Sequence, residues 1–406
     1  MSNVNFFERL LDGVTVEWKT LGDVTQPTTN IKWREANRSY QYIDLTSVSI
    51  EAKAIIETSE ITSSNAPSRA QKLVKNGDVI FATTRPAQQR YCLIDDAYDS
   101  EVASTGYCIL RANRAEVLPK WILYWIASAD FKEYVEKNQS GSAYPAISDA
   151  KVKDFKIPVP CPENSKKSLE IQAEIVRILD AFTELTSELT TELSVRKKQY
   201  NYYRDQLLSF EKGKVEWKPL GEVCRLINGR AYKQPELLEN GKYPVLRVGN
   251  FFTNGNWYYS DLELDENKYC DNGDLLYAWS ASFGPKIWDG KKVIYHYHIW
   301  KVIPDVSLVL KNYLFHVLAW DMDSVKSEHG TGSTMMHIGK GSIEKRLVPV
   351  PSINEQARIV EILDNFEALT NSNTEGLPRE IELRQKQYAY YRDLLFSFPK
   401  PEEVEA

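Results

Sequence analysis

The side chains best suited to chemistry in this chain are hydrogen-bonding ones, and they gather in four short stretches. Two lie in the first half, KWREANRSYQY and TTRPAQQRY, and two in the second half, RLINGRAYK and WSASFGPK with the lysines beyond it. Arg and Gln can make the paired hydrogen bonds that distinguish guanine from adenine in the major groove of DNA. The alternative for each residue is an ordinary solvated surface position. The candidates are Lys32, Arg34, Arg38, Tyr40, Arg85, Gln88, Gln89, Arg90, Arg225, Asn228, Arg230, Lys233, Trp279, Ser280, Lys286, Lys291 and Lys292.

Recognised catalytic patterns are missing from the sequence. It contains no GxxxxGK(S/T) phosphate loop, no HExxH, no GxSxG and no Asn/Asp-Pro-Pro-aromatic motif of amino-methyltransferases. His296 and His298 alternate in YHYHIW and would share one face of a strand, but no third ligand has a recognisable spacing, so we expect no metal site. Non-catalytic function is therefore the first expectation.

Cysteine usage and hydropathy indicate a reduced, aqueous compartment. The chain has five scattered cysteines without a CxxC pair, which is typical of buried thiols in the cytosol. No apolar run approaches the 18 or so residues that a membrane span needs, and the first residues lack a basic-then-apolar signal pattern. We expect a cytoplasmic protein without a membrane partner.

The charge of the chain is unevenly distributed. The formal net charge is −6, yet residues 1–168 carry 21 basic and 21 acidic side chains and residues 213–352 carry 17 and 16. The acidity therefore lies between and after these two segments. A protein that held DNA alone would usually show a basic excess. If nucleic acid is the target, partner subunits should supply much of the phosphate binding.

The organisation of the chain is a duplication. RKKQYNYYRDQLLSF (196–210) returns as RQKQYAYYRDLLFSF (384–398), and QAEIVRILDAF (172–182) returns as QARIVEILDNF (356–366). The bodies between these blocks hardly match, apart from a VEW entrance, an NGD turn before a strand and a Pro-Val-Pro exit. A period near 190 residues is too long for a solenoid and indicates duplicated domains.

The repeated blocks predict two helical arms. Residues 169–211 contain neither Gly nor Pro, and apolar side chains recur at alternating steps of three and four, as in a coiled-coil seam. We assign Tyr203 and Tyr391 to the seam between the arms. TELT-SELT-TELS (183–194) is either a plain amphipathic helix or a spacer of adjustable length. In the second arm, Asn, Gly and Pro in residues 369–380 predict an interruption.

The predicted fold class is α+β. Two mixed α/β globular bodies are separated by long helices that pair as an antiparallel coiled coil in a circular, pseudo-twofold arrangement. The expected boundaries are residues 1–168 for the first body with a stub of arm, 169–212 for the first arm, 213–352 for the second body, and 353–406 for the second arm and tail. Residues 1–15 should dock beside the end of the second arm.

On these repeats the chain resembles the specificity subunits of type I restriction-modification systems. The resemblance covers essentially the whole chain and rests on the paired blocks around Gln172 and Gln356, Arg196 and Arg384, and Trp18 and Trp217. It departs from the pattern only in the broken second arm.

This resemblance implies a non-catalytic subunit in which each body, a target recognition domain, reads one half of a bipartite, asymmetric double-stranded DNA sequence. It also implies docking of two methyltransferase subunits and two restriction and translocation subunits, with S-adenosylmethionine, ATP and Mg²⁺ bound by those partners and no cofactor on this chain. Two alternatives stay open: a coiled-coil scaffold that stands alone, and an enzyme with degenerate nuclease or methylase motifs. The bases read, the gap between half-sites and the presence of a restriction subunit cannot be deduced from the sequence.

Overall fold

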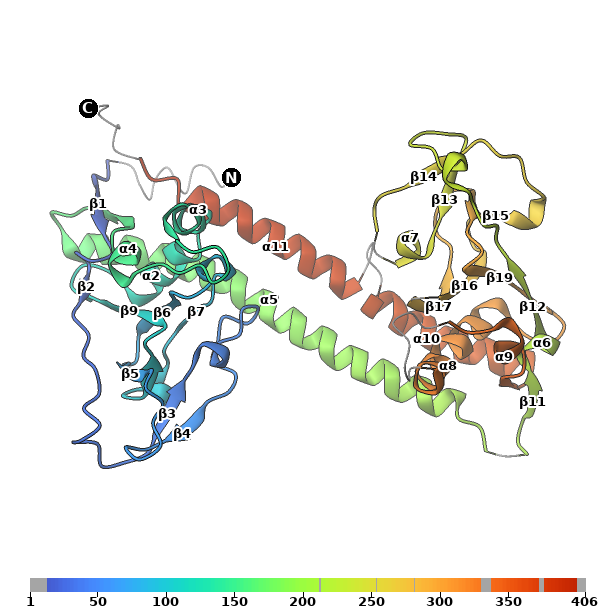
Figure 1. The fold of residues 1–406 in the computed structure, drawn as a ribbon, viewed down its shortest axis with the longest axis horizontal. Coiled ribbons are helices and arrows are strands. Elements are labelled where there is room, and N and C mark those ends of the chain that lie inside the picture. The colour runs from blue at the N-terminus through green and yellow to red at the C-terminus, as the bar shows by residue number, and fades with distance from the viewer. Residues whose placement is uncertain are drawn as a thin grey trace. The chain divides into compact units, whose positions relative to one another are not determined.

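The computed structural model describes residues 13–211, 213–252, 254–280, 282–329, 337–371 and 376–399 (Figure 1). The chain divides into two compact units, Met1–Thr186 with Arg384–Ala406, and Ser187–Leu383. Both boundaries fall inside helices of the arms, α5 (Ser165–Leu208) and α11 (Gly376–Leu395). Each unit therefore contains one body and a part of each arm.

The first body contains two four-stranded sheets and a two-stranded ribbon. One sheet has the order β2 (Thr25–Gln26), β9 (Tyr107–Ala112), β6 (Asp78–Ala82), β7 (Tyr91–Leu93), and the other β4 (Ser59–Ile61), β3 (Tyr40–Ile43), β8 (Val102–Ser104), β5 (Ala70–Leu73). All their pairings are antiparallel except the parallel pair β3–β8. The ribbon pairs β1 (Val16–Thr20) with β10 (Lys156–Pro160). The strand predicted after the NGD turn of this body is β6.

The helices of the first body cover one sheet and bury large aromatic side chains. They are α2 (Pro119–Ile126), α3 (Ala129–Asn138) and α4 (Asp149–Lys153), with short 3₁₀ turns at Leu45–Ser47, Pro86–Gln88 and Asp96–Tyr98. Residues 119–138 form two helices rather than one, because Ser128 caps the second by accepting a hydrogen bond from the Phe131 amide at 3.2 Å. Trp121, Trp125 and Phe131 are fully buried in the core of this body.

The second body repeats the same architecture strand for strand. Its sheets have the orders β12 (Cys224–Asn228), β19 (Ile299–Pro304), β16 (Leu275–Ser280), β17 (Ser282–Ile287), and β14 (Tyr258–Ser260), β13 (Tyr243–Leu246), β18 (Val293–Tyr295), β15 (Tyr269–Cys270). The parallel pair is β13–β18, in the place of β3–β8, and β11 (Glu216–Pro219) pairs with β20 (Leu347–Val350) as the ribbon. Two bodies with little sequence identity thus share one fold.

The helices of the second body and the second arm differ in part from those of the first body, since one long helix, α8 (Lys311–His329), replaces the pair α2 and α3. The others are α6 (Leu220–Val223), α7 (Val248–Phe252), α9 (Lys340–Glu344) and α10 (Ile353–Asn371), with 3₁₀ turns at Gln234–Glu236 and Glu266–Lys268. At its Pro-Val-Pro exit each body has a short helix followed by a strand, α4 with β10 in the first body and α9 with β20 in the second. The α+β class, with two sheet-rich bodies and a 44-residue helix, is confirmed as well.

A buried glutamine fixes each body to its own arm. The side chain of Gln172 on α5 accepts a hydrogen bond from the Leu118 amide at 3.0 Å and donates to the Glu116 carbonyl at 2.9 Å. Gln356 on α10 repeats this with the Leu310 amide and the Leu308 carbonyl, both at 2.8 Å. Both side chains are fully buried. The repeated sequence blocks are therefore the places where body and arm are joined.

The seam residues assigned from the sequence lie where they were predicted. Within the first unit Tyr391 stacks on Phe182, and within the second unit Tyr203 stacks on Phe366. The predicted interruption of the second arm is confirmed, because α10 ends at Asn371 and α11 begins as a separate helix at Gly376. The φ of Gly376 is +76°, a backbone conformation that favours glycine.

The end of the second arm returns to the first body. Phe396 stacks on Trp125, and the Trp18 indole on β1 donates to the Pro399 carbonyl at 2.7 Å. The docking predicted for residues 1–15 falls mostly on residues 1–12, which lie outside the described residues. Within the described ranges, no helix is both long and apolar enough to cross a membrane.

Candidate nucleic-acid interface

In the first body, Arg85 and Gln88 are the candidates best placed to touch a ligand. They lie in the turn between β6 and β7, where both side chains are exposed. Arg85 is held in the left-handed region at φ +50° while its amide donates to the Pro145 carbonyl at 2.7 Å. Its guanidinium lies 5.0 Å from the ring of Tyr144, which is 70% exposed. The fixed backbone presents a cation and an aromatic ring to solvent together.

Three neighbouring candidates are held by the protein itself. Arg38 forms an ion pair with Glu101 at 2.8 Å, donates to the Ser100 carbonyl and covers the half-buried ring of Tyr40. The guanidinium of Arg90 donates to the Val48 carbonyl. These three side chains already make contacts within the first body, so binding a ligand through Arg38 or Arg90 would cost existing hydrogen bonds.

The other candidates in this body differ in how exposed they are. The Gln89 amide donates back to the Pro86 carbonyl at 3.2 Å, and the Gln89 carbonyl accepts from Lys53. Lys32 is exposed in a loose ion pair with Glu35 at 3.3 Å. Arg34 is exposed and has no ionic partner among the described residues. Lys32 and Arg34 therefore remain available to a ligand.

In the second body, Arg230 is the most firmly held candidate. Both of its terminal nitrogens contact the Glu236 carboxylate, at 3.0 and 2.8 Å. The bidentate pair, together with a hydrogen bond from the Lys233 amide, lowers the pKa of Glu236 to about 2. Asn228 donates to the Tyr297 carbonyl at 3.2 Å. These contacts give Arg230 and Asn228 a structural role, while the side chain of Lys233 is exposed.

Trp279 and Ser280 lie in strand β16 and are mostly covered by the protein. The Trp279 ring stacks on Trp300 at 5.5 Å, and its indole nitrogen donates to the Tyr297 carbonyl at 2.9 Å. Ser280 is only 1% exposed. A ligand could reach the edge of the Trp279 ring but not the Ser280 hydroxyl.

The remaining basic candidates of this body lie on its surface. Lys286 is 3.8 Å from Asp289, and Lys292 is 3.6 Å from Glu266 while it covers the ring of Tyr269. Exposed ion pairs of this kind contribute little and are easily exchanged for another anion. Arg225 and Lys291 are exposed and have no ionic partner among the described residues.

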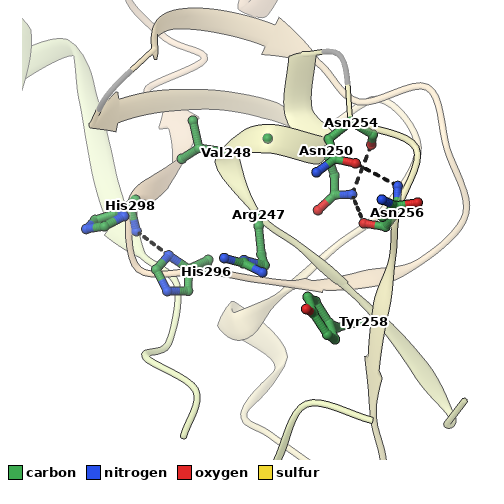
Figure 2. Close-up of a pocket in the computed structure, with 9 residues that line it drawn as sticks. Arg247, Val248, Asn250, Asn254, Asn256, Tyr258, His296 and His298 are labelled. Carbon is green, nitrogen blue, oxygen red and sulfur yellow. Dashed lines mark hydrogen bonds between the residues drawn. The ribbon is translucent and has the colours of Figure 1, made fainter. Parts of the chain in front are cut away.

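A concave site lies beside α7, and its arginine was not among the candidates. Figure 2 shows Arg247 at its centre, with asparagines on one side and two histidines on the other. The cleft holds about 340 Å³ and contains no carboxylate. The exposed guanidinium of Arg247 lies 5.3 Å from the ring of Tyr258. Its lining residues are Arg247, Val248, Gly249, Asn250, Asn254, Asn256, Tyr258, His296 and His298.

The two histidines reach this cleft from a turn and not from a strand. The expectation that they share a face of a strand was wrong, because β18 ends at Tyr295 and a turn comes next. The turn nevertheless brings the rings of His296 and His298 within 4.8 Å. Burial, with a smaller contribution from His298, lowers the pKa of His296 to about 4, and burial also lowers the pKa of His298. His296 is therefore uncharged at neutral pH.

Arg247 was missed because it stands alone in the sequence. Candidates were taken from stretches rich in Arg, Lys and Gln, whereas YPVLRVGN contains a single cation. The signal was the comparison of the two bodies: β3 is followed by Asp44, and the equivalent strand β13 is followed by Arg247. A change from acid to base at one position of a duplicated fold could have identified the site.

One group of side chains could be considered for a metal, and it lies away from the cleft. Ligand atoms of His316, Asp364 and Glu367 all lie within 4.8 Å of one another. His316 Nε2 contacts Asp364 at 2.6 Å, and Nδ1 has no hydrogen-bond partner. The first unit has Tyr124 bound to Asp180 in the equivalent position. We assign no metal here, since the Asp364 contact already orients the imidazole.

All five cysteines are buried and unpaired, as the sequence predicted. Burial raises the pKa of the Cys92, Cys108, Cys224 and Cys270 thiols to about 12. A thiol of that acidity is mostly protonated at neutral pH and is a poor nucleophile. These four residues therefore act as small core side chains.

Comparison with known proteins gives a consistent result. The family described as type I restriction modification DNA specificity domain matches residues 14–196 and again residues 213–383. A type I restriction enzyme specificity subunit of Escherichia coli is 38% identical over 419 residues, covering 100% of both chains. The EcoprrI specificity subunit of the same species is 32% identical and covers 92% of this chain and 93% of its own.

Solved structures agree on the fold. A chain from a study of complex assembly and conformational transition of the type I R-M system has a TM-score of 0.61 at 22% identity, covering 94% of this chain and 97% of its own. The type I restriction-modification S subunit of M. genitalium has a TM-score of 0.58 at 15% identity, covering 96% and 98%. At these identities the likeness concerns the fold alone.

Proposed function

The chain belongs to the type I restriction-modification DNA specificity family, and from that membership we propose how this subunit divides its work. It is a non-catalytic subunit that confers DNA sequence specificity. We propose that each body reads one half of a bipartite, asymmetric double-stranded DNA target. Membership in this family argues against both alternatives raised by the sequence, a coiled-coil scaffold that stands alone and an enzyme with degenerate motifs.

The observation that carries this proposal is one fold with two different surfaces. The strand orders of the two bodies are the same, yet the exposed groups differ: Arg85 and Gln88 lie in the turn after β6, and Arg247 and Asn250 lie after β13. A shared framework places each body on DNA in an equivalent way. Different side chains then contact different base edges, which is why the two half-sites should differ in sequence.

The arms are proposed to dock the catalytic partners and to set the gap between half-sites. The two copies of the YYRD block each present an exposed tyrosine, Tyr202 and Tyr390, beside a seam tyrosine. Two equivalent surfaces suit two copies of one partner, so we propose two methyltransferase subunits per chain, with two restriction and translocation subunits joining them. S-adenosylmethionine, ATP and Mg²⁺ would bind those partners, and the complex would act in the cytoplasm.

The near-neutral bodies support this division of labour. Because they lack a basic excess, methyltransferase partners should provide most phosphate contacts while this chain provides base contacts.

The test is methylation of a randomised DNA library by the chain assembled with methyltransferase subunits. The expected product pattern is two different short sequences at a fixed spacing. Methylation without sequence preference, or one symmetric half-site repeated, would contradict the proposal. Saturation titration with the methyltransferase gives the stoichiometry, and a complex that stops at one partner per chain would contradict the paired docking surfaces.

A further inference from the structure

We propose that the cleft beside α7 reads a G·C base pair of the second half-site, with Arg247 donating to the guanine and Asn250 accepting from the cytosine amino group. This inference rests on the proposed function and names the bases that one site recognises.

Arg247 is the donor, and no carboxylate of the described residues competes for it. The other arginines at turns of this body are committed: Arg230 holds Glu236, and Arg346 holds Asp321 and Glu328. Within the described ranges Arg247 has no such partner, and its guanidinium carbon lies 5.3 Å from the centroid of the Tyr258 ring. The side chain is exposed, so its edge nitrogens are open to a ligand. An arginine in this state is suited to paired hydrogen bonds with guanine O6 and N7.

Asn250 supplies an acceptor of fixed orientation. Its side-chain Nδ2 donates to the backbone carbonyls of Asn254 at 3.0 Å and Asn256 at 2.7 Å (Figure 2). Both partners are carbonyl oxygens, so the nitrogen of the amide must face them and both of its hydrogens are used. The remaining Oδ1 can therefore only accept. Among cytosine and guanine atoms in the major groove, the cytosine N4 amino group is the donor that it fits.

The two groups are spaced for one base pair. Arg247 immediately precedes α7 and Asn250 is three residues later, a separation that brings Cβ atoms on one helical face to about 5–6 Å. The Arg247 carbonyl accepts from the Phe251 amide at 2.9 Å, which continues the helical turn through Arg247. In the major groove a G·C pair presents N7 and O6 as acceptors and then N4 as a donor. Donors from Arg247 followed by an acceptor from Asn250 match that order.

The charge of the cleft favours a base edge over a phosphate. Its lining contains one cation, Arg247, since burial keeps His296 neutral at pH 7. Phosphate sites usually gather several donors with positive charge or a helix N-terminus of adequate length, whereas α7 has only five residues. In the first body the equivalent strand is followed by Asp44, whose carboxylate would repel guanine. The equivalent position of the first body should therefore not repeat this G·C contact.

The experiment compares variants of the full chain, each assembled with methyltransferase subunits, on a DNA library randomised over both half-sites. Arg247→Ala should reduce discrimination at one G·C position of one half-site by about tenfold to a hundredfold. Arg247→Lys should lose most of the same discrimination, because lysine keeps the charge but not the paired geometry. Asn250→Ala should weaken preference at that same base pair. Asn250→Asp should weaken it as well, because a carboxylate cannot donate to the Asn254 and Asn256 carbonyls and would compete with guanine for Arg247.

The matched control is Lys345→Ala, which removes an exposed cation of the same body outside the cleft and should leave the base preference unchanged. Equal weakening on all sequences for Arg247→Ala would assign Arg247 to phosphate and overturn this inference, while the proposed function would stand. An effect at an A·T pair, or none at all, would overturn it too. A wild-type complex without any sequence preference would instead remove the proposed function itself.

Discussion

The ring of Tyr391 stacks on Phe182 with centroids 5.4 Å apart and planes inclined by 21°. The duplicate of this pair, Tyr203 on Phe366, has values of 5.5 Å and 26°. Each pair joins a residue of one arm to a residue of the other within a single unit. The same contact is thus used twice, in two units with differently sequenced bodies.

Truncating either tyrosine should therefore destabilise its own unit. We expect Tyr203→Ala and Tyr391→Ala each to lower the free energy of unfolding by about 1 kcal/mol, since Tyr391 is half-buried and Tyr203 is 45% exposed, and each substitution removes one stacked aromatic pair. Urea unfolding monitored by circular dichroism measures this. Tyr390→Ala is the control, because that ring is 63% exposed and its loss should change little. Equal effects of all three substitutions would show that the stacking contributes nothing.

The buried glutamines should be more sensitive than their sequence neighbours. Gln172→Leu and Gln356→Leu each leave a buried backbone amide and a carbonyl without a partner, at a cost of about 1–3 kcal/mol. Denaturant unfolding of the two variants should give similar losses. Asn365→Ala, at an exposed position on α10, provides the comparison and should lie close to wild type.

The first body offers its own test of base reading. Arg85→Ala and Gln88→Ala should relax one half-site, each by about 1–3 kcal/mol of discrimination, and leave the other half-site intact. Arg90→Ala should instead lower stability, because the Arg90 guanidinium holds the Val48 carbonyl. Methylation mapping with each variant separates these effects. Lys132→Ala, on the exposed side of α3, is the charge-matched control.

Glu367 should make the second unit pH-sensitive. Burial, with a smaller contribution from Asp364, raises the pKa of this carboxyl to about 7 from an ordinary value of 4.5. Between these values the folded protein holds a proton that the unfolded chain has released. The contribution of Glu367 to the free energy of unfolding therefore falls as pH rises through that window.

Glu367→Gln replaces the titrating carboxyl by an amide that stays neutral at every pH. The variant should be more stable than wild type by about 1–2 kcal/mol at a pH near 8 and indistinguishable from it near 4.5. Melting temperatures of both proteins across the range give the measurement. Nδ1 of the buried His316 lies 3.9 Å from the Glu367 carboxylate, so the difference between the two proteins reports the carboxyl together with its imidazole neighbour. Glu361→Gln, at an exposed position of α10, should show no such pH-dependent gain.

The spacer prediction can be tested on α5, which contains the four-residue units in one unbroken helix. Deleting Ser187–Thr190 shortens the helix by about 6 Å and rotates the helix beyond the deletion by about 40°. If the arms set the gap, the unread DNA between half-sites should shrink by one or two base pairs, at about 3.4 Å each, with both half-sites unchanged. Replacing Ser187 and Thr190 by Ala keeps the length and should keep the gap. An active deletion variant with the original gap would show that these units are only helix filler.

The arms were predictable because their signal is local and repeated. A long stretch without Gly or Pro, an apolar stripe and a second copy were enough to assign Tyr203 and Tyr391 to the seam. The interface residues were harder because exposure depends on partners far along the chain. Nothing near Arg38 in the sequence indicates that Glu101 will bind it, and nothing near Trp279 indicates that it will stack on Trp300. Arg247 is the opposite case. It stands alone in the sequence, and it has no acidic partner among the described residues.

The ribbons that open and close each body, β1 with β10 and β11 with β20, have a consequence for how such proteins acquire new targets. Val16 lies opposite Pro160, and Glu216 lies opposite Val350, so a body enters and leaves its arm at adjacent points. A recombination event that exchanges everything between these strands would replace the body and leave the arms and their buried glutamines untouched. One such crossover would create a new pairing of half-sites, without disturbing the surfaces proposed here for the other subunits.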